Sequence, residues 1–469
     1  MSGTLPILDD TIAAIATPPG AGGLAVVRVS GRAAIEVADR VFAGGMRLDQ
    51  AASHTLHHGW ARWPADVEPS LQRRLDEVVA AVFRAPRSYT REHVIELSCH
   101  GGELPSRRVL AALLAAGARL ARPGEFTLRA FLNGRLDLTR AEAVADVIAA
   151  ASEAASDLAL AQLSGALSLR LDALHDRICD ALAEIEARVD FAEDVGGVEV
   201  PPAVISSIDE VASELGAMLA GSSYARAIRE GVRVPLIGRP NVGKSSLFNA
   251  LLGEARAIVT PLPGTTRDRV SEAIELAGIR VTLSDTAGIR ATRDPIEALG
   301  VERSRGELNA SPLAVWVVDA SQPLTSEDFQ IASALAGRRS LVALNKSDLD
   351  CRVGSSEVAE LLSGGPSMAV PVSALHGAGV DALREALATA LGATDGALGE
   401  AVSNPRHAEA LARAQAAVVR AGAAGRASAP GECVALELRE ALAAIGEVTG
   451  RSVSEELLDR IFSRFCIGK

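Results

Sequence analysis

The sequence predicts three kinds of domain in one chain: a small α+β domain, an all-α domain in two pieces, and an α/β domain inserted between those pieces. Two observations support this. Strand-like and helix-like stretches alternate from about residue 231 to residue 391, and stretches with apolar residues at helical spacing lie on both sides of that segment. The expected domains are therefore residues 1–136, 137–230, 231–391 and 392–469, the second and fourth forming one helical domain.

The first 136 residues have the mixed pattern of a small α+β domain. The expected elements are two strands with a turn within residues 10–30, strands at 77–83 and 93–98, and helices around 32–41 and 103–116. Nothing in this region alone identifies a ligand.

Helices are expected on both sides of the α/β segment. Asn133-Gly134 stops one helix, and Thr139 to Glu142 has the form of a capping box that opens the next. No proline follows until after Ala192, which predicts one long helix or two collinear ones. Further helical stretches are expected at 204–228, 406–421, 436–444 and 454–462.

Composition and charge narrow the class of protein. A net charge of −12 indicates no large basic face, so an RNA partner would dock on a local patch or through another protein. The five cysteines contain no C-x-x-C pair, which argues against a structural zinc or a disulfide framework and fits a reducing cytosol. No apolar run approaches ~18 residues, so no membrane span and a cytoplasmic location are expected.

A glycine-rich loop joins an apolar strand-like run to a helix-forming stretch. Gly238 to Ser245 fits G-x-x-x-x-G-K-[ST], in the strand–loop–helix setting of a phosphate-binding loop. Backbone N–H groups at the start of such a helix hold an anion. Lys244 would reach the β- and γ-phosphates, and the Ser245 hydroxyl would bind Mg²⁺.

Three further short motifs follow predicted strands of the same segment. Asp285-Thr286-Ala287-Gly288 would place its carboxylate near Mg²⁺ and its last N–H near the γ-phosphate. In Asn345-Lys346-Ser347-Asp348 the final carboxylate can accept hydrogen bonds from N1–H and the 2-amino group of guanine, a pair of donors that adenine lacks. Ser373-Ala374-Leu375 can donate a backbone N–H to guanine O6. In this order the motifs predict a Ras-like P-loop GTPase domain with a mostly parallel sheet.

Two departures from Ras-like enzymes bear on hydrolysis. Ile289 stands where those enzymes use a glutamine to orient the attacking water, and no arginine finger is evident. Asn241 lies in the phosphate loop, and the switch-like loop Thr260–Thr266 is rich in turn residues. Asn241 either helps carbonyls of that loop hold a monovalent cation against the phosphates or only orders its own loop.

The motifs G-R-P-N-V-G-K-S-S-L-F-N-A-L, P-G-T-T-R-D, D-T-A-G-I-R and N-K-S-D resemble those of the bacterial tRNA modification GTPase family MnmE, also called TrmE. Three stretches outside the GTPase segment are more specific: A-T-P-P-G-A-G-G-L-A-V-V-R-V-S-G, R-P-G-E-F-T-L-R-A-F-L-N-G-R-L-D-L and the terminal R-I-F-S-R-F-C-I-G-K. The resemblance covers essentially the whole chain.

The resemblance implies a homodimer formed through the N-terminal domains, each binding a tetrahydrofolate that carries a one-carbon unit (5-formyl or methylene). It implies joint action with the FAD-dependent protein MnmG, in which an aminomethyl-type or carboxymethylaminomethyl group is placed on C5 of the wobble uridine of certain tRNAs. The GTPase domains are expected to pair across their switch regions with the help of K⁺.

The resemblance also assigns residues. GTP contacts fall on Asn241, Val242, Gly243, Lys244, Ser245, Ser246, Thr260, Pro261, Leu262, Pro263, Gly264, Thr265, Thr266, Asp285, Thr286, Ala287, Gly288, Asn345, Lys346, Ser347, Asp348, Ser373, Ala374 and Leu375. Mg²⁺ ligands fall on Ser245 and Thr266, and K⁺ ligands on Asn241, Thr260, Leu262 and Thr265. The catalytic carboxylate falls on Glu297, and folate contacts fall on Arg28, Glu96, Arg135 and Lys469.

Three positions differ from the family pattern or have an open role. Pro295 precedes Glu297 by two residues where other residues are common, and Arg135 stands where lysine is also used. Cys466 has either a packing role or a chemical one.

A ribosome-assembly GTPase is the alternative function, but such proteins append an RNA-binding module or a basic tail, and this tail is helical and ends in C-I-G-K. A membrane-linked GTPase is disfavoured because no hydrophobic span is present.

Overall fold

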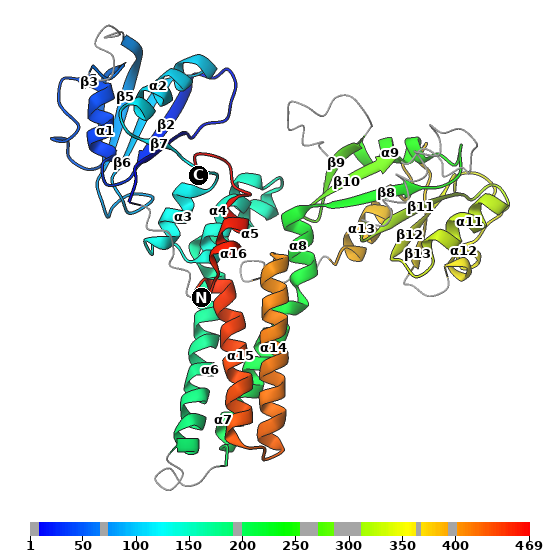
Figure 1. Ribbon diagram of the computed structural model, residues 1–469. Helices are drawn as coiled ribbons and strands as arrows, with labels where there is room; N and C mark the ends of the chain where they lie inside the picture. Colours follow the sequence, from blue (N-terminus) through cyan, green and yellow to red (C-terminus); the bar gives the residue numbers. More distant parts are fainter. Residues whose placement is uncertain are drawn as a thin grey trace. The chain divides into compact units, whose positions relative to one another are not determined.

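The computed structural model of the chain describes residues 9–65, 74–190, 199–253, 271–285, 311–362, 367–392 and 401–469. The chain folds into two compact units, each built from segments distant in sequence (Figure 1). The first unit is Met1–Ala145, Leu163–Cys179 and Arg439–Lys469, and the second is Asp146–Gln162 and Asp180–Leu438. The expected α+β, helical and α/β parts are all present. Their exact boundaries at residues 136, 230 and 391 stay predictions.

The first unit contains a seven-stranded sheet in the order β3-β4-β5-β6-β2-β1-β7. Neighbouring strands are antiparallel except β1 and β7, which are parallel. The strands are β1 Ile12–Ile15, β2 Leu24–Ser30, β3 Phe42–Gly44, β4 Thr55–Arg62, β5 Arg74–Phe83, β6 Val94–His100 and β7 Arg119–Leu120.

Side-chain alternation gives this sheet two different faces. Val27 and Val29 of β2 pack with helices α1 (Ala34–Val41) and α2 (Glu103–Ala115) in one apolar core. Arg28 lies between these valines and is paired in register with Glu96 of β6. Arg28 and Glu96 therefore lie on the face that α1 and α2 do not cover.

A group of helices continues the first unit: α3 Glu125–Leu132, α4 Leu138–Ala149, the start of α6 Ala166–Asp190, the end of α15 Gly431–Thr449, and α16 Glu455–Phe462. Leu138 and Ala141 of α4 form a core with Leu458 and Phe462 of α16. Helix α4 and the last helix of the chain thus share one core, and the final residues are held close to the N-terminal sheet.

Two of the expected helix features are wrong. The capping residue of α4 is Asp137, whose Oδ1 accepts from the Arg140 N–H at 2.9 Å, so Thr139 lies inside the helix. The stretch from Thr139 to about Ala192 forms α4, α5 (Glu153–Ser164) and α6 in place of one or two helices. The hydroxyl of Ser152 caps α5, and Gly165, with φ of +98°, separates α5 from α6. Gly165 has a conformation that other residues rarely adopt.

The second unit contains a six-stranded sheet in the order β13-β12-β11-β8-β10-β9, parallel except for β9. The strands are β8 Val232–Ile237, β9 Ser271–Leu276, β10 Ile279–Asp285, β11 Ala314–Asp319, β12 Ser340–Asn345 and β13 Ser367–Pro371. Helices α9 (Lys244–Leu252), α11 (Ser326–Leu335), α12 (Ser355–Leu361) and α13 (Val380–Ala390) complete the α/β part. Apolar cores lie on both faces of the sheet, which confirms the doubly wound arrangement.

Further helices belong to the second unit. The expected helix at 204–228 is divided at Gly221 into α7 (Pro202–Ala220) and α8 (Ser222–Glu230). Helix α7 packs along α14 (Pro405–Arg426), where a Cβ on Gly425 would lie 3.2 Å from Ile205. Tyr224 and Ile228 of α8 belong to the sheet core, so α8 is fixed to the α/β part.

Candidate functional site

The phosphate loop connects buried strand β8 to helix α9 in the second unit. Asn241 and Gly243 have φ values of +62° and +94°, so two of three consecutive loop residues adopt the left-handed backbone conformation. A Cβ on Gly238 would lie 2.4 Å from the carbonyl oxygen of Val317, so the loop must start on a glycine. This backbone is the geometry expected of a tight anion-binding turn before a helix.

Lys244 is buried beneath this loop. Its ammonium donates to the carbonyl oxygens of Gly238 at 2.8 Å and Arg239 at 3.0 Å. A lysine side chain held across the loop can turn to a phosphate with little change in its backbone position. The predicted role of Lys244 is consistent with this position.

The side-chain amide of Asn345 connects the predicted motifs. Its Nδ2 donates to the carbonyl of Val242 at 2.8 Å, and its Oδ1 accepts from the Ala374 N–H at 3.0 Å. Asn345 is 2% exposed, and a Cβ on Gly243 would lie 2.2 Å from its Nδ2. The end of β12, the phosphate loop and the Ser373–Leu375 segment are therefore positioned by one buried amide.

Asp348, the residue predicted to recognise the guanine base, follows the end of β12. Its Oδ1 accepts from the Ser373 hydroxyl at 2.5 Å, and His376 Nε2 lies 3.9 Å from its Oδ2. The Ser373 hydrogen bond lowers the pKa of Asp348, so the carboxylate is ionised and able to accept from guanine. Lys346 is held by an ion pair of 2.6 Å to Asp319, at the end of β11.

A second group of predicted residues meets on the open sheet face of the first unit. Arg28 Nε lies 2.8 Å from Glu96 Oε1, and Arg28 Nη1 donates to the carbonyl oxygen of Gly468 at 3.3 Å. The Arg28 guanidinium lies 5.6 Å from the ring centres of both Tyr89 and Phe126. The chain's last residues thus contact β2, as the shared pocket predicted from the sequence requires.

Arg135 and Glu96 line a cavity of about 500 Å³ next to this contact. The Arg135 guanidinium lies 5.1 Å from the Tyr89 ring centre and donates to the Ser88 carbonyl at 2.5 Å. Burial raises the pKa of Tyr89, which keeps its phenol neutral. The cavity therefore combines one carboxylate with three guanidinium groups, those of Arg87, Arg91 and Arg135, and with the aromatic rings of Phe83 and Tyr89.

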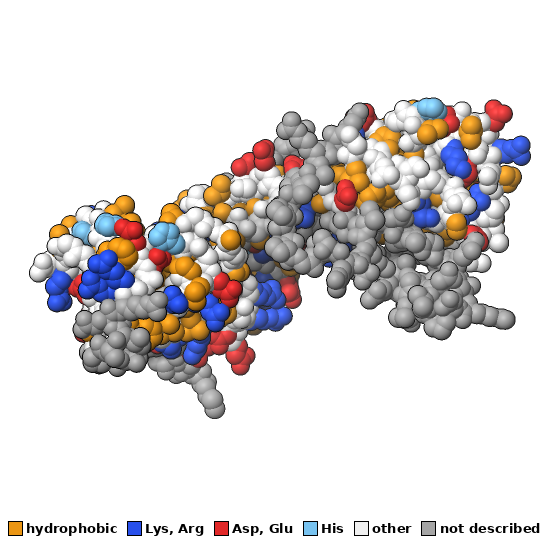
Figure 2. Space-filling view, turned by 90° about the horizontal axis from the view of Figure 1, so that it is seen from above, with side chains coloured by type: hydrophobic (Ala, Val, Ile, Leu, Met, Phe, Trp, Pro, Cys, Tyr) orange, Lys and Arg blue, Asp and Glu red, His pale blue; other side chains and the backbone are white. Residues whose placement is uncertain are grey.

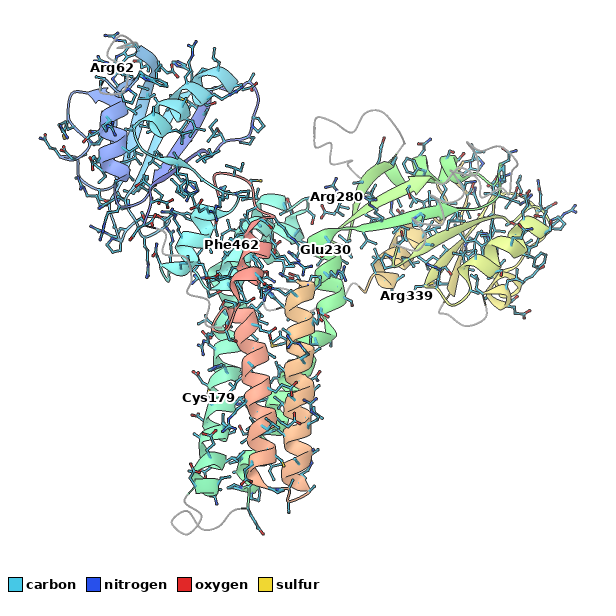
Figure 3. The ribbon with its side chains drawn as sticks, viewed as in Figure 1. Arg62, Cys179, Glu230, Arg280, Arg339 and Phe462 are labelled. Atoms are coloured by element: carbon cyan, nitrogen blue, oxygen red, sulfur yellow. The ribbon has the colours of Figure 1, made fainter. Side chains whose placement is uncertain are left out.

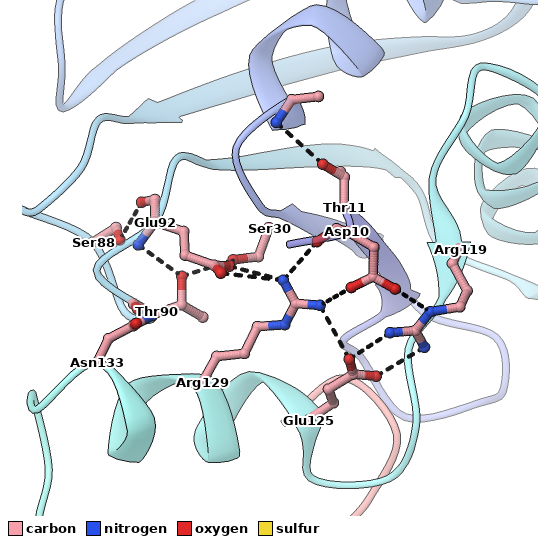
Figure 4. A network of polar contacts seen from close by, with 11 residues as sticks. Asp10, Thr11, Ser30, Ser88, Thr90, Glu92, Arg119, Glu125, Arg129 and Asn133 are labelled. Carbon is pink, nitrogen blue, oxygen red and sulfur yellow. Dashed lines mark hydrogen bonds and ion pairs between the residues drawn. The ribbon is translucent and has the colours of Figure 1, made fainter. Parts of the chain in front are cut away.

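A partly buried ionic network holds the loop that lines the cavity (Figure 4). Arg129, 1% exposed, donates to Asp10 at 2.6 Å and to Glu92 and Glu125 at 3.1 Å. Arg119 binds Glu125 at 2.6 Å and, through its hydrogen bond, lowers the pKa of Asp10. Because Glu92 ends the 86–92 loop of the cavity, this network fixes that loop against α3. Sequence reasoning did not identify these residues, since single charges give no sign of burial.

Several predicted residues lie outside the described residues: Thr260, Pro261, Leu262, Pro263, Gly264, Thr265, Thr266, Thr286, Ala287, Gly288, Pro295 and Glu297. Asp285 ends β10, next to the phosphate-loop strand β8 in register with Leu236. Ser245 is at the start of α9, and Cys466 is exposed. The carbonyl of Cys466 accepts from the Gly124 N–H at 3.3 Å, and Lys469 is partly exposed beside it.

Comparison with known proteins identifies the family. Residues 138–466 match the family model described as the MnmE helical domain, and residues 11–135 match the model described as the GTP-binding protein TrmE N-terminus. The chain belongs to the MnmE family. Three relatives, each named tRNA modification GTPase MnmE, agree: those of Symbiobacterium thermophilum (47% identical, covering 98% of this chain and 100% of the relative), Chloroflexus aurantiacus (47%; 98% and 100%) and Geobacillus kaustophilus (43%; 98% and 99%).

Membership of the MnmE family agrees with the geometry of the second unit. The chain is a P-loop GTPase that acts in tRNA modification. The four motifs predicted to contact the nucleotide begin at or follow the carboxyl ends of β8, β10, β12 and β13, the edge where doubly wound folds bind their ligands. In the part of the chain that the structure describes, every helix is too short or too polar to cross a bilayer.

Proposed function

We propose that this chain acts in the cytoplasm with an FAD-dependent protein of the MnmG type to modify C5 of the wobble uridine of certain tRNAs. The group added is of the aminomethyl or carboxymethylaminomethyl type, and its one-carbon unit comes from 5-formyl- or methylene-tetrahydrofolate. The observation that carries the proposal is the Arg28–Glu96 contact with the backbone of Gly468, beside the 500 Å³ cavity in the first unit, which contains none of the predicted nucleotide contacts.

The cavity chemistry suits a folate. The Glu96 carboxylate would accept from the amino and N–H edge of the pterin, and Tyr89 would contact its ring. Arg135 and Lys469 would meet the carboxylates of the ligand's glutamate tail, and Arg28 would orient Glu96. Arg28 is only 16% exposed and reaches across 440 positions of sequence to Gly468, which is more than a solvated surface charge needs.

The nucleotide site would use two cations. Ser245 and Thr266 would bind Mg²⁺, and Asn241 with Thr260, Leu262 and Thr265 would bind K⁺. Among the described residues, the exposed Asn241 side chain has no hydrogen-bond partner. Glu297 would activate the water that attacks the γ-phosphate. The exposed Cys466 would have a positioning role, because its backbone carbonyl accepts from the Gly124 N–H at 3.3 Å.

Glu297→Ala should slow single-turnover hydrolysis by ~10²-fold or more, the usual scale for a positioned acid–base group, with little change in nucleotide affinity.

GTP hydrolysis should be faster in K⁺ than in Na⁺ at equal ionic strength, and Asn241→Ala should remove that difference. Asn249→Ala, at an exposed position of α9 outside the predicted nucleotide contacts, is the matched control for Asn241→Ala. Equal rates in the two salts would return Asn241 to a loop-ordering role.

We also infer that the chain forms a homodimer through the open face of the N-terminal sheet. Leu24, Leu56 and Val79 lie on this face and are 70%, 71% and 37% exposed. Apolar side chains gathered on a sheet face are typical of a protein interface. Sedimentation equilibrium tests this: a monomeric wild type contradicts it, and Leu56→Glu should weaken the dimer.

Nucleoside analysis of tRNA from cells lacking this protein tests the function as a whole. Loss of the C5-modified wobble uridine, restored by the wild-type gene, is the expected result. Unchanged nucleosides together with a ribosome-assembly defect would favour the alternative, a GTPase switch without modification chemistry.

A further inference from the structure

A polar cavity of about 990 Å³ lies in the second unit, at the end of the sheet opposite the phosphate loop. The residues around it come from α8, from the starts of β8 and β10, from the segment before β11 and from the start of α14. None of these residues belongs to the nucleotide site. Its volume is at the upper end of the range typical of small-molecule sites, so it can hold several polar groups at once.

Three arginines and one carboxylate line this cavity: Arg226, Arg233, Arg280 and Glu230. Arg226 forms an exposed ion pair of 2.9 Å with Glu230. Arg233 and Arg280 have no ion-pair or hydrogen-bond partner for their side chains among the residues that the structure describes. The cavity is therefore locally basic in a chain whose net charge is −12.

The sheet register places Arg233 and Arg280 on the same side. Arg233 of β8 pairs with Thr282 of β10, and Arg280 precedes Thr282 by two positions. Residues paired across a parallel ladder, and residues two apart in one strand, point to the same face. Neighbouring strands are ~4.8 Å apart, so the two guanidinium groups can meet a single extended anion. Figure 3 shows Arg280 near Glu230, with Arg339 elsewhere on the α/β part.

The remaining polar lining consists of hydroxyl and amide side chains: Ser222, Ser223, Thr282, Ser311, Ser403 and Asn404. Arginine guanidinium groups together with serine, threonine and asparagine side chains are the groups that proteins use to contact phosphate and ribose in nucleic acids. A small apolar cofactor would need a hydrophobic lining in place of these groups.

We propose that this cavity binds backbone phosphates of tRNA. The inference rests on the proposed function and names the surface that holds the substrate RNA. Basic and acidic side chains intermingle over the face shown in Figure 2, so an RNA meets no broad basic surface there. A local cluster with two unpaired guanidinium groups supplies the attraction that the acidic chain otherwise lacks.

The test is tRNA binding as a function of salt, by the full-length wild type and by the triple variant Arg226→Ala/Arg233→Ala/Arg280→Ala. Each lost phosphate contact reduces the slope of log affinity against log salt by about 0.7 to 0.9. Losing the contacts of Arg233 and Arg280, which have no other described partner, should make the ratio of wild-type to variant affinity fall roughly 7- to 12-fold or more between about 50 and 200 mM salt. The corresponding triple lysine variant should keep most of the wild-type slope, because it keeps the charge.

A control variant, Arg339→Ala/Arg420→Ala/Arg426→Ala, removes the same charge from exposed arginines of the second unit outside the cavity. It should bind tRNA nearly as the wild type does. Equal salt slopes for the cavity and control variants would overturn the cavity assignment and leave the proposed function intact, as would a wild type that binds no tRNA alone. GTP hydrolysis and the unfolding temperature of the cavity variant should match the wild type. The proposed function is tested by a different measurement, the nucleoside analysis of tRNA from cells lacking the protein.

Discussion

Asp348→Asn should weaken GTP and GDP binding by roughly a hundredfold or more and should create a preference for xanthosine nucleotides. Hydrogen bonds to a charged group contribute about 1.5–3 kcal/mol each, and the carboxylate can accept two from guanine. The amide of asparagine offers one acceptor and one donor. Its donor suits xanthine, which has a carbonyl where guanine has the 2-amino group. Titration with the four nucleotides GTP, GDP, XTP and XDP measures the change.

The structure provides a matched control for this substitution. Asp350 is exposed two positions further along the same segment, so Asp350→Asn changes the charge equally without reaching the base site. It should leave all four affinities unchanged. If Asp348→Asn binds GTP as tightly as the wild type does and gains no affinity for XTP, guanine is recognised by other groups.

Glu96→Ala should abolish binding of 5-formyltetrahydrofolate to the isolated protein, whereas GTP hydrolysis should continue at the wild-type rate. The carboxylate is the acidic group lining the 500 Å³ cavity, and it also orients Arg28 through contacts of 2.7 and 2.8 Å. Its loss removes the acceptor for the pterin edge and releases the guanidinium. Calorimetry on the wild type and the variant measures the binding.

Two further variants distinguish recognition of the pterin by Glu96 from the positioning of Arg28 by the same side chain. Glu96→Gln keeps the shape and one acceptor for Arg28, but it cannot accept two hydrogen bonds from the pterin. It should therefore also lose binding. Glu77→Ala removes a carboxylate from neighbouring strand β5, where Glu77 pairs with His58 at 2.7 Å, and it should bind normally. Full binding by Glu96→Gln would mean that Glu96 only positions Arg28, and no binding by the wild type would contradict the folate site.

The sequence was most informative where one physical pattern dominates. The apolar runs of β8, β11 and β12 are buried on both faces, so they appear as continuous hydrophobic stretches ended by glycine or polar motifs. Strand β4 was not predicted, because its sequence T-L-H-H-G-W-A-R has few β-branched residues and its strand form depends on pairing with β5.

Tertiary contacts explain the remaining differences. The amide of Asn345 was predicted as part of a motif, but its hydrogen bonds to Val242 and Ala374 follow only from the fold. The same is true of Arg129, whose partners are separated from it by as many as 119 positions. The division of the long helical stretch into α4, α5 and α6 depends on single residues such as Gly165. One glycine lowers helix propensity by too little to predict a break from the sequence.

The hydrogen bond between Arg28 and Gly468 has a consequence for biosynthesis. The two residues are 440 positions apart. At about 5–20 residues per second, a ribosome needs roughly 20–90 s to pass from one to the other. During that interval β2 and β6 can already pair, but the carbonyl that Arg28 contacts has not yet been made. The pocket of the nascent N-terminal domain therefore stays incomplete until the C-terminal residues leave the ribosomal exit tunnel.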